Sequence, residues 1–586
     1  MQLGYSIQQP WLQGPTLGAT FQHGPGACLP APVLPQAPPA APHSPTKPRD
    51  SVGLLLEAIR PDSTRPGPET PQHGELIAQA LEAVADLARE RAGALRLIEL
   101  QGHVVIVQRL LAAMSALVAS ATSLPLDVSA ADDPRCQQLQ ASVRCLTHMA
   151  MASPSHPDLR TARAHDALLH VMLAVGLTAR TGVWALQGLV AVATDAQCAA
   201  DLARAGLLPP LAEAIQGLAA AQAHRVSCAS SSHLNAGDSQ NSLRSVGSRN
   251  SRQQQSSTEL HQYHAVLLHQ SPAEAAASEA EVQLAHMLGL LLQNMAGHRA
   301  TAKKAVEEGL VQAVCGWLCV CVPHYDVEGA VLCAAILCLL GDADQEALRH
   351  VVHADAPDAL VDMLHPRWAT CALVPATVAA AIAVSCRWGA SAQAIRMAGG
   401  LPALVSTLAG AHGPACCRPI ISALSGLIAN DPPSVRDLRT TNTVIACGLL
   451  LQLLPNNDPR SGVVRTFLRQ LGEDPDTAMR LAHTKSAEAA AAVAAVSLNL
   501  PLASPDEDRS VGGGRSSHGG DDIVGAVVAA RAAARRAYGN TGLLAEMKSY
   551  KALRRTSLKQ LAKRMDASEW EDLEDGVEVY LHAMEA

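Results

Sequence analysis

The amino-acid sequence predicts an all-α protein built as a helical solenoid, and two observations carry this prediction. The first is a short sequence motif that recurs along the chain, in which Gly or Asp precedes the apolar start of a helix. We call this motif the phrase. It appears as Gly399-Gly400-Leu401-Pro402-Ala403-Leu404-Val405 and as Gly206-Leu207-Leu208-Pro209-Pro210-Leu211. The second is composition, because hydrophobic residues make up 48% of the chain and aromatic residues only 2%. The core must therefore consist of Leu, Ala, Val and Ile, of which Ala and Leu favour helix.

The copies of this phrase are nearly evenly spaced. The first core apolar residues of its copies are Val107, Leu168, Leu211, Val314, Leu360, Leu404 and Leu450. The steps between them are 61, 43, 103, 46, 44 and 46 residues. Four of the six steps agree closely, and a fixed period of this size is typical of a helical solenoid. The two long steps contain the segments 120–135 and 224–261, which we interpret as insertions.

The segments of the chain differ sharply in composition. Residues 1–74 are rich in Pro and Gln, so we expect them to be disordered, since they cannot bury enough apolar surface to offset the entropy of ordering. Within them, Val52 to Ile59 is a short apolar stretch that we interpret as a docking helix. Residues 75–500 form the solenoid, with a disordered Ser/Gln/Asn-rich insertion at about 222–272. A Gly-rich linker at 501–522 leads to a C-terminal helical region at 523–586.

Each repeat is expected to contain three helices. They are a small helix, the helix that begins with the recurring motif (the phrase helix) and a longer apolar closing helix. Pro209 and Pro402 fit the first turn of the phrase helix, where no amide partner is needed. Gly206 and Gly399 fit the turn before it, where a positive φ is expected. The predicted closing helices span 137–151, 181–193, 281–297, 328–341, 373–387, 417–429 and 462–471.

The pattern resembles the armadillo repeat over roughly residues 75–500. The residues that carry the resemblance are Ile395 to Val405, Val183 to Leu189 and Leu291 to Ala296. It implies a right-handed α-solenoid that binds extended peptides along a concave surface lined by the last helix of each unit. Members similar to importin-α and the catenins hold the peptide backbone with an Asn on that helix, and importin-type members place a Trp four residues earlier.

The resemblance also implies where partner-binding residues lie in this chain. Asn294 matches the Asn position, but Leu290 precedes it by four residues, and Trp184 matches the Trp position, but Gly188 follows it by four. The partner-binding residues predicted in this way are His148, Trp184, Gln187, Gln293 and Asn294. The alternative is that Trp184 packs in the core and Asn294 is a satisfied polar group. Because the Trp and Asn are not paired, we expect no binding of classical basic localisation peptides.

Charge and motifs exclude several classes of function. The net charge of −8 offers no global basic field for nucleic acid. The chain has no Gly-x4-Gly-Lys, His-Glu-x-x-His or Gly-x-Ser-x-Gly motif, so we expect no enzyme and no cofactor. The cluster Cys315, Cys319, Cys321, Cys333 and Cys338 lies in apolar runs, so we expect buried packing thiols and no metal.

We expect no transmembrane segment and no signal peptide, and a cytoplasmic location with the nucleus as alternative.

The C-terminal region carries a sharp division of charge. Residues 547–565 contain seven Lys or Arg and no acid, with an apolar face, whereas 566–586 contain eight Asp or Glu and no Lys or Arg. A basic amphipathic helix can bind a calmodulin-like or other acidic partner, or an acidic membrane surface. The alternative is a cap on the last repeat. Within it, Arg554-Arg555-Thr556-Ser557-Leu558 resembles the consensus of cyclic-nucleotide-dependent kinases, so Ser557 is a predicted regulatory phosphosite.

These observations favour a non-catalytic scaffold or adaptor whose partners are other proteins or peptides. One alternative is a transport adaptor similar to importin-α, which would need the paired Trp and Asn. Another is a regulatory subunit that docks a kinase or a ubiquitin ligase, with any activity belonging to the partner.

Overall fold

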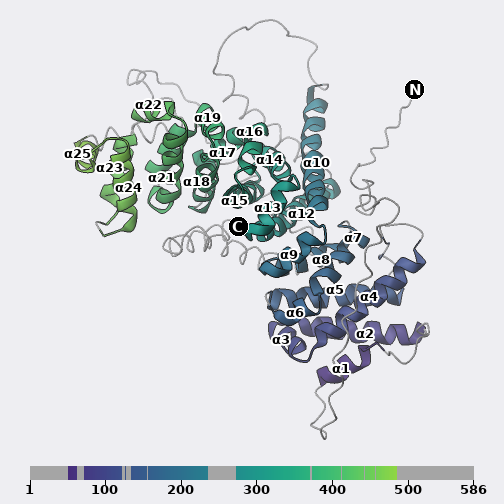
Figure 1. Cartoon of the computed structure of the whole chain (residues 1–586). Coiled ribbons are helices and arrows are strands. Elements are labelled where there is room, and N and C mark those ends of the chain that lie inside the picture. The colour runs from purple at the N-terminus through teal and green to yellow at the C-terminus, as the bar shows by residue number, and fades with distance from the viewer. Residues whose placement is uncertain are drawn as a thin grey trace, which may run out of the picture. The chain divides into compact units, whose positions relative to one another are not determined.

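The computed structural model describes residues 51–61 and 71–484, with a long gap at 235–271. Shorter gaps lie at 122–125, 127, 129–132, 155, 178, 370–371, 411, 441–442 and 456. Throughout these ranges the regular structure is helical and contains no strand (Figure 1). The expected all-α class is thus confirmed for the described part of the chain, and its architecture is consistent with an α-solenoid. The predictions for the linker at 501–522, for the C-terminal region at 523–586 and for Ser557 lie outside the described residues.

The described helices fall into two compact units. The first unit comprises Met1–Ala214 together with Leu290–Thr301, and the second comprises Ile215–Gly289 together with Ala302–Ala586. Helices of the first unit are α1 (Ser51–Ile59), α2 (Pro71–Ala88), α3 (Arg91–Glu99), α4 (Gly102–Ser120), α5 (Pro134–Ala152), α6 (Pro157–Thr161), α7 (Ala164–Val175), α8 (Arg180–Val192) and α9 (Ala196–Arg204). Three helices have residues in both units, namely α10 (Leu208–Leu234), α12 (Pro272–Ala296) and α13 (Arg299–Glu307).

The remaining helices belong to the second unit. They are α14 (Leu310–Cys321), α15 (Val327–Ala343), α16 (Ala347–His353), α17 (Ala356–Asp362), the 3-10 turn η1 (Pro366–Trp368), α18 (Leu373–Ser385), α19 (Gly389–Met397), α20 (Gly400–Ala409), α21 (Gly413–Asn430), α22 (Pro433–Thr440), α23 (Thr443–Leu453), α24 (Pro459–Gln470) and α25 (Pro475–Thr484). Closing helices α15, α18, α21 and α24 pack against one another in that order, and α25 packs on α23.

The helices follow one another as triplets of a short helix, a phrase helix and a closing helix. Triplets of this kind are α3–α4–α5, α6–α7–α8, α9–α10–α12, α13–α14–α15, α16–α17–α18, α19–α20–α21 and α22–α23–α24. Within the first unit, α2 packs on α5 and α5 packs on α8 (Figure 1). Within each unit, consecutive closing helices therefore form a layer in which neighbouring side chains come from different repeats.

A residue with positive φ precedes many of the phrase helices. Gly206 and Gly399 have φ of 84° and 88°, as predicted for a turn before a helix start. Gln101, Arg163 and Asp355 occupy the same place with φ between 54° and 57°, although none is a glycine. This left-handed residue lies between the short helix and the phrase helix, so it recurs at the same place in these repeats.

The N-terminal boundary lies earlier than the expected residue 75. Helix α2 begins at Pro71, and α1 packs on α2 and α4 with Leu56 and Ile59 buried. The guanidinium of Arg109 in α4 donates to the carbonyl oxygens of Ile59 and Arg60, the latter at 3.1 Å. The short apolar stretch within 1–74 is thus a helix docked on the first repeat.

The structure describes part of each of the two predicted insertions. Helix α10 continues to Leu234, so the chain is helical well past residue 222, because Ala-rich residues 218–223 favour helix. Residues 235–271 lie outside the described residues. In the first insertion, the amide of Leu126 donates to the carbonyl of Ala174 at 2.9 Å, and Leu126 and Val128 are buried. That insertion is therefore anchored to the first unit.

One described helix, Gly102–Ser120, has the length and apolar composition that could cross a membrane. More than half of that window is buried within the fold, as is usual for a core helix. The described residues therefore do not indicate a transmembrane segment.

Candidate functional site

The layer of closing helices in the first unit carries a row of charged side chains centred on Arg144 of α5. Its Nη2 lies 2.6 Å from Oε2 of Glu82 and 3.7 Å from Oδ1 of Asp86, both on α2. The side chain of Arg144 is only 25% exposed. A guanidinium held by a neighbouring carboxylate has few rotamers left to lose on binding, so it is preorganised.

Trp184 of α8 lies on the other side of Arg144. The guanidinium carbons of Arg144 and Arg180 lie over its ring, 5.5 and 4.9 Å from the ring centroid. Cations at these distances are attracted to the face of an indole. The carbonyl of Trp184 accepts a hydrogen bond from Oγ1 of Thr147 at 2.8 Å, and only 8% of the residue is exposed. Trp184 is thus a buried platform whose ring is covered by arginine.

His148 lies one helical turn after Arg144 on the same face of α5 and is partly exposed. Burial, and to a smaller extent the positive charges of Arg144 and Arg89, lower the pKa of His148 to about 4, against the opposing effect of Asp86. His148 is therefore neutral at pH 7. Because the two arginines outweigh Asp86, the electrostatic field at its ring is positive.

We call these residues the α5 strip: Glu82 and Asp86 from α2, Arg89 from the turn that follows α2, Arg144 and His148 from α5, and Arg180 and Trp184 from α8. It joins two of the predicted partner-binding residues, His148 and Trp184. Its arginines were missed by the sequence interpretation, although Arg144 precedes His148 by four residues and so shares its helix face. The strip offers guanidinium hydrogen-bond donors, two of which lie over the buried ring of Trp184, and such donors suit recognition of another molecule.

The other three predicted residues are buried away from solvent. Gln187 and Gln293 are 4% and 3% exposed, and Asn294 is 5% exposed. The amide Nδ2 of Asn294 donates to the carbonyl of Val190 in α8 at 2.8 Å. Asn294 thereby links α12 to α8 within the first unit, as the alternative of a satisfied polar group describes.

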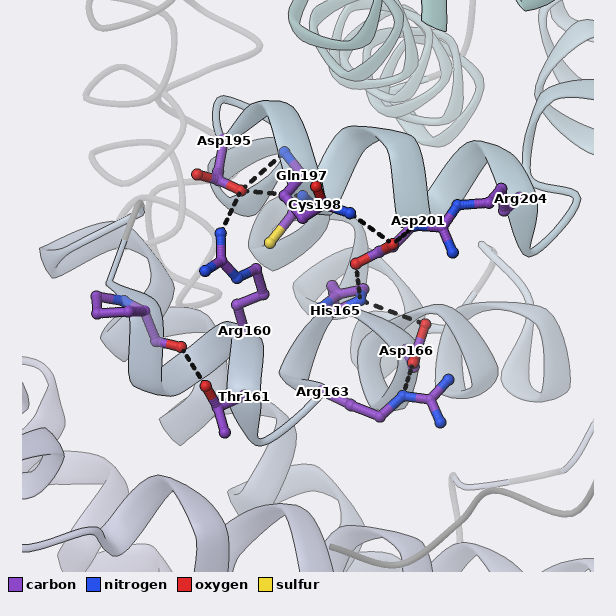
Figure 2. A network of polar contacts seen from close by, with 11 residues as sticks. Arg160, Thr161, Arg163, His165, Asp166, Asp195, Gln197, Cys198, Asp201 and Arg204 are labelled. Carbon is purple, nitrogen blue, oxygen red and sulfur yellow. Dashed lines mark hydrogen bonds and ion pairs between the residues drawn. The ribbon is translucent and has the colours of Figure 1, made fainter.

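A second polar network lies where α7 meets α9, and Figure 2 shows it from close by. His165, 3% exposed, has its Nε2 3.5 Å from Asp166 and 3.6 Å from Asp201. Arg163 pairs with Asp166, and Arg204 pairs with Asp201 (Figure 2). Burial lowers the pKa of His165, while the two carboxylates act in the opposite direction.

His103 occupies the equivalent position in the preceding triplet. Both histidines are the second residue of a phrase helix that follows a non-glycine residue of positive φ. His103 is 2% exposed, and burial is the main cause that lowers its pKa, with Asp158 of α6 opposing. Each imidazole therefore faces an acidic residue on the short helix of the next triplet.

The second unit contains a buried cluster at the start of α15. Asp326 caps this helix by accepting from the amide of Gly329 at 3.0 Å, and it lies 3.0 Å from Nε2 of His286. The thiol of Cys321 donates to the same carboxylate at 3.5 Å. Burial raises the pKa of the Cys321 and Cys333 thiols, so both are protonated at neutral pH. Within the part of the chain that the structure describes, no group of three or more such side chains is arranged to hold a metal ion.

The class that the fold defines is an all-helical protein of repeated helix triplets. No protein-family model and no curated protein matches the chain. Solved structures that are similar to it include two crystal structures of engineered proteins from the Northeast Structural Genomics Consortium. One is 16% identical, covering 78% of this chain and 96% of that chain with a TM-score of 0.43. The other is 15% identical, covering 65% and 98% with a TM-score of 0.27. At these scores the likeness adds nothing to the helical architecture described above.

Proposed function

We propose that this protein is a non-catalytic interaction scaffold or adaptor that binds other proteins through its layer of closing helices. In this proposal the repeats form a right-handed solenoid of the armadillo type, and the layer lines its concave face. The observation that carries the proposal is the α5 strip, where Arg144 and His148 stand partly exposed between charged α2 and the arginine-covered Trp184. Stacked repeats extend such a surface one closing helix at a time.

The use of Asn294 supports a scaffold over a transport adaptor similar to importin-α. In the importin-type pattern this amide would hold a peptide backbone, but here it donates to Val190 of the same chain. Breaking that bond would leave a buried carbonyl unpaired, which costs about 1–3 kcal/mol. Recognition is therefore assigned to the arginines of the α5 strip.

The test is affinity purification of the full-length chain from extract of its own source, with partners identified by mass spectrometry. Arg144→Glu and Arg180→Glu change the strip, and Arg96→Glu on α3 is the matched control, since Arg96 is exposed, pairs with Glu99 on its own helix and lies outside the strip. We expect both strip variants to lose a set of partners that wild type and the control retain. Circular dichroism verifies that all four proteins are equally helical. Identical partners for all four would refute the strip as the binding surface.

A further inference from the structure

We infer that the segment bound by the α5 strip is an acidic peptide of a partner protein, whose spaced carboxylates pair with Arg89, Arg144 and Arg180. This inference rests on the proposed function and adds the chemistry of the partner. It concerns one surface of the first unit, formed by α2, α5 and α8.

The first argument is the sign of the local field. The pKa of His148, at the centre of the strip, responds to the charges around it. Arg144 and Arg89 disfavour its protonated form, and together they outweigh Asp86, which favours that form. The chain as a whole carries a charge of −8, so this positive field is a local property. A carboxylate entering beside His148 is attracted, whereas an ammonium group is repelled.

The second argument is the presence of exposed guanidinium groups at both edges of the strip. Arg89 is exposed and forms no ion pair with any carboxylate among the described residues. Arg180 is exposed at the opposite edge, with its guanidinium over the ring of Trp184. Guanidinium groups bind carboxylates through two parallel N–H···O bonds, and stacking on an aromatic ring fixes their plane. The strip therefore has a guanidinium group on each side of Arg144 that can bind a carboxylate.

The third argument favours a peptide over a nucleic acid. Glu82 and Asp86 lie in the same strip and contact Arg144. A phosphate backbone has a continuous row of negative charges and would be repelled by these carboxylates. An acidic peptide places its carboxylates at intervals, so neutral positions can pass Glu82 and Asp86.

Binding is coupled to the protonation of His148. The groups that face His148 are Arg144 on its own helix, Asp86 of α2 and Arg89 in the turn after α2. An added carboxylate stabilises the imidazolium, so the pKa of His148 rises when the peptide binds. Acidic peptide and proton therefore bind cooperatively.

The test measures binding of fluorescein-labelled dodecapeptides to the full-length chain by fluorescence anisotropy. The three probes alternate Gly with Glu, with Gln or with Lys, and a single-stranded dodecanucleotide is the fourth. We expect the Glu peptide to bind about 10-fold more tightly than the Gln peptide and to weaken as salt rises from 50 to 300 mM. The Lys peptide should bind no better than the Gln peptide.

Variants separate recognition from folding. Arg180→Gln and Arg89→Gln, both at exposed positions, should each weaken the Glu peptide about 5-fold, and Arg96→Gln should leave it unchanged. Glu82→Gln should raise the affinity for the Glu peptide, because Arg144 loses its carboxylate partner Glu82. A loss of folding cannot raise this affinity. In wild type, histidine NMR should show the pKa of His148 rising on addition of the Glu peptide.

Equal affinity for the Glu and Gln peptides would overturn this inference, and so would tighter binding of the oligonucleotide. Binding that appears only after deletion of acidic residues 566–586 would also overturn it, because the occupant would then be the chain itself. The scaffold proposal fails by a different result, the unchanged partner set of the Arg144→Glu and Arg180→Glu chains. The two ideas are therefore distinguishable.

Discussion

The imidazole of His165 in α7 lies 3.6 Å from the carboxylate of Asp201 in α9, although the two residues belong to consecutive helix triplets. The contact joins a phrase helix to the short helix that begins the next repeat. Nδ1 of His165 is buried without a hydrogen-bond partner among the described residues. The junction therefore contains a titratable group that is neutral and enclosed at pH 7.

We predict that the first unit loses stability on mild acidification. Burial lowers the pKa of His103, His148 and His165 below the ordinary value of 6.5. The unfolded chain then binds protons more readily than the folded one, so stability is fully present above pH 6.5 and falls as the pH drops toward the folded values, about 4 for His148. Each pKa unit by which folding lowers the pKa of a histidine contributes about 1.4 kcal/mol to the free energy of unfolding.

The measurement is hydrogen exchange of α7 and α9 between pH 7.5 and 5.0, corrected for the intrinsic rates. Protection should decrease below pH 6.5 in wild type and decrease less in His165→Gln. Exposed His73 provides the matched control, and His73→Gln should behave like wild type. Pairing with Asp166 and Asp201 could instead stabilise the charged ring, and a rise in protection on acidification would show that the sign is wrong.

Asn294→Ala should lower the thermal stability of the chain. The substitution removes the hydrogen bond to Val190 and leaves a buried carbonyl unpaired, at a cost of about 1–3 kcal/mol. Exposed Asn430, whose amide donates within its own helix to Gly426, is the control, and Asn430→Ala should cost less than about 0.5 kcal/mol. Equal midpoints for the two variants in thermal unfolding by circular dichroism would contradict the structural role of Asn294.

Gly188→Ala should destabilise the first unit, whereas Gly217→Ala should not. A Cβ at Gly188 would lie 2.8 Å from Cδ1 of Leu168 and 3.0 Å from Oγ1 of Thr147, so these two buried side chains would have to shift. Overpacking of this kind costs about 1–3 kcal/mol. Gly217 in α10 has no atom within 4 Å of such a Cβ, so alanine should stabilise by about 0.5–1 kcal/mol. Denaturant unfolding of both variants measures the difference.

Asp326→Ala should be more destabilising than Asp133→Ala, although both aspartates cap a helix. Asp133 accepts only from the amide of Arg135, so its loss should cost about 1 kcal/mol. Asp326 also pairs with buried His286 and accepts from Cys321, so about 2–4 kcal/mol should be lost. Asp326→Asn keeps an oxygen for the cap and should lie between the two. Chemical denaturation gives all three values, and equal losses for Asp326→Ala and Asp133→Ala would show that the cap alone matters.

The helices and their order follow from the sequence because the signals are local. The predicted closing helices 181–193 and 462–471 correspond to Arg180–Val192 and Pro459–Gln470. Apolar residues three and four apart, with Pro and Gly at the ends, specify such segments without reference to the rest of the chain. The positive φ of Gly206 and Gly399 was predicted for the same reason. Those of Gln101 and Arg163 were not, because their side chains carry no such signal.

The roles of the polar residues were decided only by the tertiary structure. In sequence, Asn294 and Trp184 look like two recognition residues of a peptide groove. Once α12 packs on α8, the amide of Asn294 meets a carbonyl 104 positions away. When α5 packs on α8, Arg144 comes to lie over Trp184, 40 positions along the chain. Such contacts depend on which helix faces lie together, and the apolar period fixes a buried face without naming the neighbour that covers it.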